Sequence, residues 1–179
     1  MRVSGCVRPI RYDRRMTQQA VGLNPRDAAF IEGGVAIIAA ARNAENEATV
    51  SRAIGCRVSD DRRRVTIFLS AAKSGALLAD VRANGVIAVV FSQPTSHRAI
   101  QLKGTDASVV ALTADDPHVW AVYPGRIAAE VQRIGFSDVF VRTMLSVPSG
   151  DVVAVAFTPS AAFIQTPGPK AGTPLETPP

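Results

Sequence analysis

Cationic and hydroxyl side chains lie at positions in this sequence where they would suit an anionic ligand. Arg52 and Arg57 are five residues apart, and Ser70 and Lys73 come just before a segment with helical periodicity. A phosphate group requires charge-assisted hydrogen bonds from Arg and Lys, with hydroxyl donors beside them. The helix dipole does not favour a cation at a helix start, so an anionic ligand would account for Lys73.

The spacing of the two arginines sets a condition on a shared ligand. In a regular strand, residues an odd number apart point to opposite faces of the sheet. Arg52 and Arg57 would therefore contact one ligand only across a bulge, which Gly55 would permit. Without a bulge, one of the two arginines faces solvent.

Other catalytic and metal-binding patterns are missing from the sequence. It contains no GxGxxG motif, no Walker-type phosphate loop and no GxSxG motif. The histidines, His97 and His118, and the cysteines, Cys6 and Cys56, lack the spacing of a zinc site. Two cysteines do not make a disulfide framework, and they fit a reducing, cytoplasmic environment.

The net charge of +5 comes almost entirely from the N-terminal end. Residues 1–15 contain five arginines and a single aspartate, and the remaining sequence is nearly neutral. No basic face typical of a nucleic-acid-binding domain is therefore expected. Residues 1–20 are predicted to be a disordered basic tail. No apolar run reaches the roughly 18 residues of a membrane span.

The elements expected to position these side chains are mostly strands. Short apolar runs and turn residues predict six of them, at 35–41, 52–58, 64–69, 86–91, 98–112 and 151–157. Helices are predicted at 24–31 and 74–83, and in part of 113–135, where Pro117 and Pro124 would divide the helix. Because the strands follow one another in hairpin order, an antiparallel barrel with peripheral helices is favoured. The domain is assigned to residues 21–166, followed by a Pro-rich arm at 167–179.

Two blocks of sequence occur together in an informative order. The first is Ser51–Val58, SRAIGCRV; the second comprises FLSAAK at 68–73, VIAVVF at 86–91 and QPTSHRAIQLKG at 93–104. In this order they resemble the core of the FMN-binding split barrels of the pyridoxamine 5'-phosphate oxidase superfamily. The resemblance covers about residues 25–166. It implies a mainly β fold with peripheral helices, a six-stranded antiparallel split β-barrel.

The resemblance also implies an FMN cofactor, held in a groove between the two protomers of a homodimer. Arg52 and Arg57 match a pair of basic FMN contacts, and Ser70 and Lys73 match the segment on the phosphate side. The full set of residues that the resemblance assigns to the cofactor is Ser51, Arg52, Arg57, Ser70, Lys73, Thr95, His97, Arg98 and Gln101. No catalytic acid or base is assigned, because a flavin itself carries the redox chemistry.

A homodimer is also expected from the residues themselves. The strands predicted at 35–41, 86–91 and 151–157 are apolar on both faces. A small barrel covers only the inner face of its strands with its own core. A two-fold partner is the commonest way to bury the outer face.

The C-terminus departs from the pyridoxamine 5'-phosphate oxidases, which end in an Arg-Leu-x-Pro type segment that helps to hold substrate. Residues 163–172 read FIQTPGPKAG, so the resemblance is to the uncharacterised branch and the small-molecule substrate is not identified. The leading hypothesis is an FMN-dependent oxidoreductase. The alternatives are a flavin-binding protein without turnover, a reductase that uses the deazaflavin F420, and a dimeric scaffold with a degenerate site. Haem binding is less favoured, since neither histidine lies in a recognisable haem segment.

Overall fold

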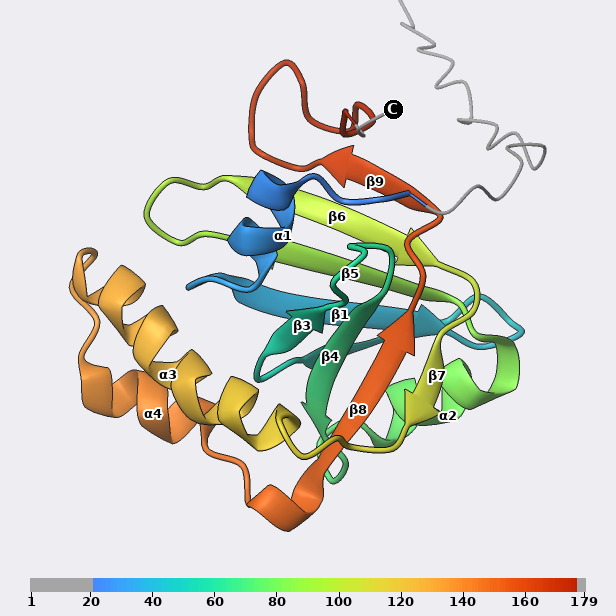
Figure 1. Cartoon of the computed structure of the whole chain (residues 1–179), viewed down its shortest axis with the longest axis horizontal. Helices are drawn as coiled ribbons and strands as arrows, with labels where there is room; N and C mark the ends of the chain where they lie inside the picture. Colours follow the sequence, from blue (N-terminus) through green and yellow to red (C-terminus); the bar gives the residue numbers. More distant parts are fainter. Residues whose placement is uncertain (1–20, 177–179) are drawn as a thin grey trace, which may run out of the picture.

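The fold consists of two antiparallel β-sheets and four α-helices within residues 21–176, which the computed structural model describes (Figure 1). The predicted basic tail at residues 1–20 lies outside the described residues. The predicted mainly β class with peripheral helices is confirmed. The strands form two separate sheets rather than one closed ring of hydrogen bonds. None of the helices in the described part of the chain has the length and apolar character needed to cross a membrane.

The two sheets divide the strands unevenly. The five-stranded sheet has the order β2 (Ala48–Arg52), β1 (Ala36–Arg42), β5 (Ile87–Ser92), β6 (Ala99–Gly104) and β9 (Ala161–Ile164). The four-stranded sheet has the order β3 (Cys56–Val58), β4 (Val65–Ser70), β8 (Val152–Phe157) and β7 (Ser108–Val110). The main core lies between their inner faces and is built largely from aliphatic side chains such as Ile37, Val89 and Ile67.

The number of strands differs from the predicted six, because two predicted strands each contribute to both sheets. The predicted strand at 52–58 is interrupted at Gly55, whose φ of +151° separates β2 from β3. The predicted strand at 98–112 is interrupted at Gly104, where a Cβ atom would lie 2.8 Å from Cδ2 of Phe157. The short strand β9 was not predicted. The described residues therefore form nine strands.

The predicted helices are present, and one was missed. Asn24 caps α1 (Pro25–Ile31) by accepting the N–H of Asp27, and Gly85 ends α2 (Gly75–Asn84) with a φ of +67°. The predicted division at Pro117 and Pro124 is wrong, because α3 (Asp116–Gln132) is continuous. Pro117 lies in its first turn, where a missing N–H costs nothing. The helix α4 (Asp138–Leu145) was not predicted.

Helix α3 covers the outer face of the four-stranded sheet. Ile54, Phe68 and Ala154 form a second, smaller core there with Trp120 of α3. The ring centroids of Phe68 and Trp120 are 5.3 Å apart. This layer matters for the site, because the outer face of β4 is closed by the chain's own helix.

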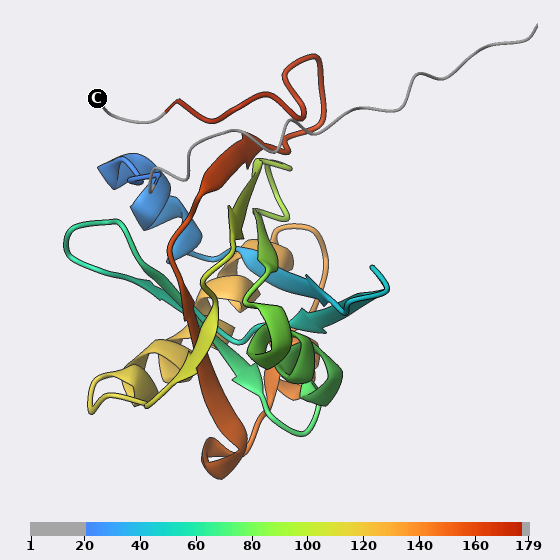
Figure 2. The ribbon, with the colours of Figure 1, turned by 90° about the vertical axis from the view of Figure 1, so that its right-hand side faces the viewer.

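The C-terminal segment turns back along β9 after residue 166 (Figures 1 and 2). The N–H of Gly172 donates to the carbonyl of Ile164 at 2.7 Å, and that of Leu175 donates to Ala162 at 2.9 Å. The described part of the predicted Pro-rich arm therefore pairs with the edge strand of its own chain. Both views place it at the same end of the molecule as α1.

Candidate functional site

The nine residues assigned from the sequence fall into separate groups within one chain. Ser70 and Lys73 lie where β4 ends and α2 begins. Both views place this connection at the lower end of the molecule (Figures 1 and 2). Arg57 lies in β3, while Thr95, His97 and Arg98 belong to the turn between β5 and β6. Ser51, Arg52 and Gln101 belong to the five-stranded sheet. That these residues bind a cofactor remains a prediction.

The segment from Ser70 to Ser74 gathers hydrogen-bond donors around one carboxylate. The hydroxyl of Ser70 donates to Oδ2 of Asp151, and the N–H of Ala72 donates to Oδ1 at 2.8 Å. The hydroxyl of Ser70 also accepts the N–H of Lys73 at 3.2 Å. The hydrogen bond from Ser70 is the main cause that lowers the pKa of Asp151, with that of Ala72 and the charge of Lys73 adding to it. The segment is therefore organised to hold a negatively charged oxygen.

Ser74 adds an unused donor to this segment. It occupies the N-cap position of α2, yet its side chain makes no capping hydrogen bond. Its hydroxyl is buried and has no hydrogen-bond partner within residues 21–176. A buried polar group without a partner is costly and calls for an explanation. An anion bound at the start of α2 would provide one, because N–H groups there favour negative charge.

Arg57 is engaged in a different place. Its Nε donates to Oδ1 of Asp116 at 2.8 Å, and the Asp116 side chain is fully buried at the start of α3. By strand register Arg57 lies opposite Thr66, on the sheet face that α3 covers. Gly55 therefore does not form the bulge that would let Arg52 and Arg57 face one ligand, and Arg52 is exposed, which is the alternative that the sequence left open. It marks the point where the chain passes from one sheet to the other.

The turn between β5 and β6 holds three of the predicted residues. Thr95 donates to Oε2 of Glu130 in α3 at 2.5 Å, and Arg98 donates to Oδ1 of Asp27 in α1 at 2.6 Å. His97 is exposed and adopts a φ of +57°, where its backbone closes the turn by donating to the carbonyl of Gln93 at 3.0 Å. The position of His97 is explained by this turn alone.

Arg52 and Gln101 lie on the outer face of the five-stranded sheet. The register places Arg52, Ile38, Val90, Gln101 and Phe163 in one row across it. Ser51 pairs with Ala39 and shares the opposite, inward face. Arg52 and Gln101 therefore lie in the same row, with β1 and β5 between them. Ser51 points to the opposite face of the sheet.

Four acidic residues at these positions were missed by the sequence reasoning. Each accepts a hydrogen bond from one predicted cofactor residue, in the pairs Asp116 with Arg57, Asp151 with Ser70, Glu130 with Thr95 and Asp27 with Arg98. No local pattern links the members of a pair, because they are between 35 and 81 residues apart in the chain. A first-turn position marks Asp27 in α1 and Asp116 in α3 as acidic residues at a helix start, but it does not reveal their arginine partners.

Comparisons with known proteins give matches at the level of structure. No family model matches the sequence, and no curated protein sequence matches it. HupZ of Group A Streptococcus has a TM-score of 0.50 at 16% identity, covering 84% of this chain and 100% of that one. A Lactobacillus delbrueckii protein provisionally named a pyridoxamine 5'-phosphate oxidase has a TM-score of 0.49 at 12% identity, covering 79% and 93%.

A third solved structure, an F420 reductase, has a TM-score of 0.44 at 13% identity and covers 75% of this chain and 93% of that one. HupZ, at a TM-score of 0.50, is similar to this chain in fold. At these identities the likeness concerns the fold alone.

Proposed function

We propose that the protein binds a flavin as a split-barrel oxidoreductase, and that the segment Ser70–Ser74 holds the phosphate of FMN. The observation that carries this proposal is the set of donors converging on Asp151 at the start of α2. These donors suit a phosphate oxygen as well as a carboxylate oxygen. Lys73 supplies a charge, and the hydroxyl of Ser74, which has no hydrogen-bond partner within residues 21–176, supplies a further donor.

Asp151 would have to give way to the phosphate, since both need the hydroxyl of Ser70 and the N–H of Ala72. Asp151 belongs to a short 3₁₀ turn, Ser149–Asp151, at the start of β8. Arg57, Thr95 and Arg98 are not given a phosphate contact, because carboxylates of the chain already hold them. A bound flavin supplies electron and hydride transfer, and the chain supplies binding and orientation.

Titration of the purified protein with FMN, riboflavin and F420 tests the proposal directly. Lys73→Ala is expected to weaken FMN binding by roughly ten- to a hundredfold, because a charge-assisted contact contributes about 1.5–3 kcal/mol. Riboflavin has no phosphate, so its affinity should stay unchanged. Arg82→Ala removes an equal charge from the other end of α2 and serves as the control. Absence of FMN binding, or an equal loss for both ligands, would show that Lys73 contacts no phosphate.

Asp151→Asn provides an independent test of the same site. The substitution removes the charge that competes with the phosphate but keeps a side chain of the same shape. We expect FMN to bind more tightly, by several-fold at low salt, while riboflavin affinity is unchanged. Isothermal titration calorimetry measures both. Weaker FMN binding in the variant would contradict a phosphate position at Asp151.

We further infer that the protein is a homodimer that uses the outer face of the five-stranded sheet. Ile38, Ala40, Ala88 and Val90 are apolar and half-exposed there. A mainly apolar groove of about 750 Å³ lies at one end of this sheet and includes Ala40 and Ala88 in its lining. The outer face of β8, which was also expected to need a partner, is covered by α3 instead. The five-stranded sheet is therefore the surface that a second copy would bury.

A further inference from the structure

A cavity of about 640 Å³ opens beside the five-stranded sheet, where α1, β6 and β9 meet. This volume is typical of sites that bind small molecules. Residues from the start of α1, from the β6–β9 pair and from the C-terminal return line it. The elements that line it, α1, β9 and the C-terminal return, lie at the opposite end of the molecule from the connection between β4 and α2 (Figures 1 and 2). It is therefore separate from the proposed phosphate site within one chain.

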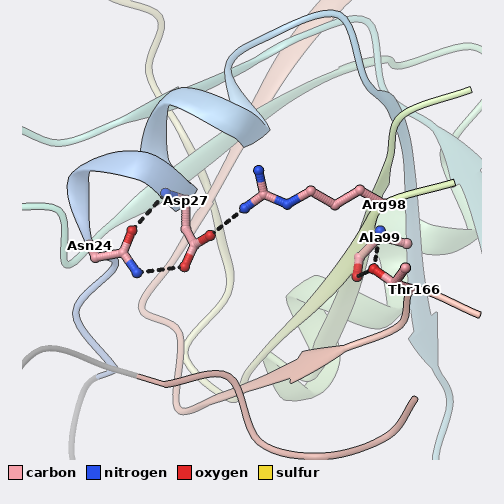
Figure 3. Close-up of polar contacts among 5 residues, drawn as sticks. All are labelled: Asn24, Asp27, Arg98, Ala99 and Thr166. Carbon is pink, nitrogen blue, oxygen red and sulfur yellow. Dashed lines mark hydrogen bonds and ion pairs between the residues drawn. The ribbon is translucent and has the colours of Figure 1, made fainter. Parts of the chain in front are cut away.

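Arg98 is fixed in position at this cavity. Its Nη2 donates to Oδ1 of Asp27 at 2.6 Å (Figure 3), and its guanidinium carbon lies 3.9 Å from the centre of the Phe30 ring. Asp27 is 5% exposed, and its second oxygen accepts Nδ2 of Asn24 at 2.7 Å. Asp27 holds the edge of the guanidinium and the Phe30 ring holds its face. A guanidinium fixed in this way loses little conformational freedom when it binds a ligand. Arg98 is thus preorganised to hold an anion.

Arg98 also keeps donors for a ligand. A guanidinium carries five N–H groups, and within residues 21–176 its one hydrogen bond is the bond to Asp27. The side chain is 32% exposed. A purely structural role, in which Arg98 connects α1 to the start of β6, would need only the ion pair with Asp27. Such a role does not account for the cavity beside the remaining N–H groups of the guanidinium.

The C-terminal return forms a fixed wall of the cavity. The N–H of Gln165 donates to the carbonyl of Ala99 at 2.7 Å. The hydroxyl of Thr166 accepts the N–H of Ala99 at 3.0 Å (Figure 3). Further along, the N–H of Leu175 donates to Ala162 at 2.9 Å. These bonds hold the described part of the arm against β6 and β9.

The charges on the cavity lining favour a single negative charge. The lining cations are Arg26, Arg98 and Lys170, and the lining carboxylates are Asp27 and Glu176. Because Asp27 is neutralised by Arg98, the remaining groups leave the cavity with an excess of positive charge. Apolar side chains also line it, namely Ile100, Ile164, Pro174 and Leu175. A ligand that matches this lining has one anionic end and one apolar end.

We propose that this cavity binds a small organic monoanion, a carboxylate attached to an apolar group, with Arg98 as the anchor of the carboxylate. The planar guanidinium matches a carboxylate in geometry as well as in charge. This ligand site goes beyond the proposed flavin site and does not depend on it.

Benzoate is a suitable probe, and benzamide is its neutral counterpart of nearly the same shape. We expect NMR titration of the full chain to give shifts at Ile100, Ile164 and Leu175 with benzoate. Benzamide should bind at least about tenfold more weakly, because a charge-assisted contact is missing. Equal binding of the two probes, or no binding of benzoate at millimolar concentration, would overturn the proposal.

Variants of the ion pair test the anchor. Arg98→Gln should lower benzoate affinity about tenfold or more. The double variant Asp27→Asn with Arg98→Gln should do the same while leaving no buried carboxylate unpaired. Arg63→Gln changes an exposed arginine in the β3–β4 turn and should have no effect. Unchanged benzoate affinity in a folded Arg98 variant would refute the anchor.

Exposed cations provide a test that does not endanger the fold. The double variant Arg26→Gln with Lys170→Gln should lower benzoate affinity by roughly two- to fivefold, and more so at low salt. FMN affinity should remain unchanged in all these variants. A loss of FMN binding in the Arg98 variants would place Arg98 in the cofactor site and overturn the proposal. Failure of the protein to bind FMN at all would leave the benzoate result standing.

Discussion

Acidic partners distant in sequence decide the roles of individual residues in this protein. Arg57 and Arg98 resemble ligand-binding arginines in the sequence, yet their partners lie 59 and 71 residues away. Removing a charge from water is costly unless it is paired, so buried Asp116 and Asp27 fix these arginines. Contacts over such distances leave no local sequence signal. Ser70 and Lys73 precede a helix that the sequence predicted, and their role in binding a cofactor stays a prediction.

Asp116→Asn is expected to destabilise the fold in a pH-dependent way. Burial by itself would raise the pKa of Asp116, but hydrogen bonds from Thr113 and Arg57 outweigh it and hold the pKa below its usual range. A carboxyl group whose pKa is lower in the folded chain than in the unfolded chain stabilises the fold above about pH 4. This contribution is lost as the pH falls below that value. We expect a loss of about 1.5–3 kcal/mol in unfolding free energy at pH 7, shrinking toward pH 3.

Urea denaturation at pH 7 and pH 3 measures this difference. Asp115→Asn changes the exposed neighbouring residue and serves as the control. The control should match the native protein at both pH values. A destabilisation of Asp116→Asn that is as large at pH 3 as at pH 7 would contradict the assigned charge of Asp116.

Cys56 is expected to be unreactive in the folded protein. Burial raises the pKa of its thiol well above the usual value, and the charge of Glu32 adds to this shift. The thiol also donates to the carbonyl of Ile31 at 3.0 Å. Since the thiolate is the reactive form, a Cys6→Ser variant should not react with Ellman's reagent at pH 8 until urea unfolds it. Rapid reaction without urea would mean that the surroundings of Cys56 open readily.

At the scale of elements, the sequence predicted what local chemistry determines. Asn24-Pro25 marked the start of α1, and Gly85 marked the end of α2. The division of α3 at Pro124 was wrong because packing of Ile127 and Ala128 into the core outweighs one missing hydrogen bond. The separate strands β6 and β7 were missed because both halves of 98–112 have strand character. Which sheet each half joins depends on contacts far away in the chain.

Gly104→Ala tests the point where the chain leaves the five-stranded sheet. A Cβ atom there would lie 2.8 Å from Cδ2 of Phe157 and 3.1 Å from the carbonyl oxygen of Thr158. Phe157 is fully buried, so neither group can move freely. We expect a loss of about 1–3 kcal/mol in unfolding free energy. Gly150→Ala, where nothing lies within 4 Å, should change it little. Equal stability of the two variants would mean that Phe157 moves to make room for the added Cβ atom.

At the scale of the whole molecule, the outer surfaces of the two sheets are treated differently. Helix α3 packs Trp120 against Phe68 and so covers the four-stranded sheet. The five-stranded sheet has no such layer over Ile38 and Val90 within the described residues. The sequence predicted apolar outer faces for both sheets. It did not distinguish them, because the helix that covers one of them comes from a distant part of the chain.

The proposed homodimer predicts that Val90→Lys produces a monomer. Val90 lies in the middle row of the outer face, between Ile38 and Gln101. A lysine there would be exposed in a monomer, so the chain would still fold. Burying the lysine in a dimer would leave its charge unpaired. Val139→Lys, on an exposed valine of α4, is the matched control and should remain dimeric. Sedimentation velocity at micromolar concentration distinguishes the two states.

Flavin binding connects this variant to the proposed site. If the site is completed by the second protomer, Val90→Lys should lose flavin affinity along with dimerisation, although Ser70 and Lys73 are unchanged. Raising the protein concentration should restore both together, because mass action couples association to binding. A native protein that sediments as a monomer and still binds flavin at full affinity would refute both the dimer and the shared site. A dimeric Val90→Lys variant would place the interface on another face of the molecule.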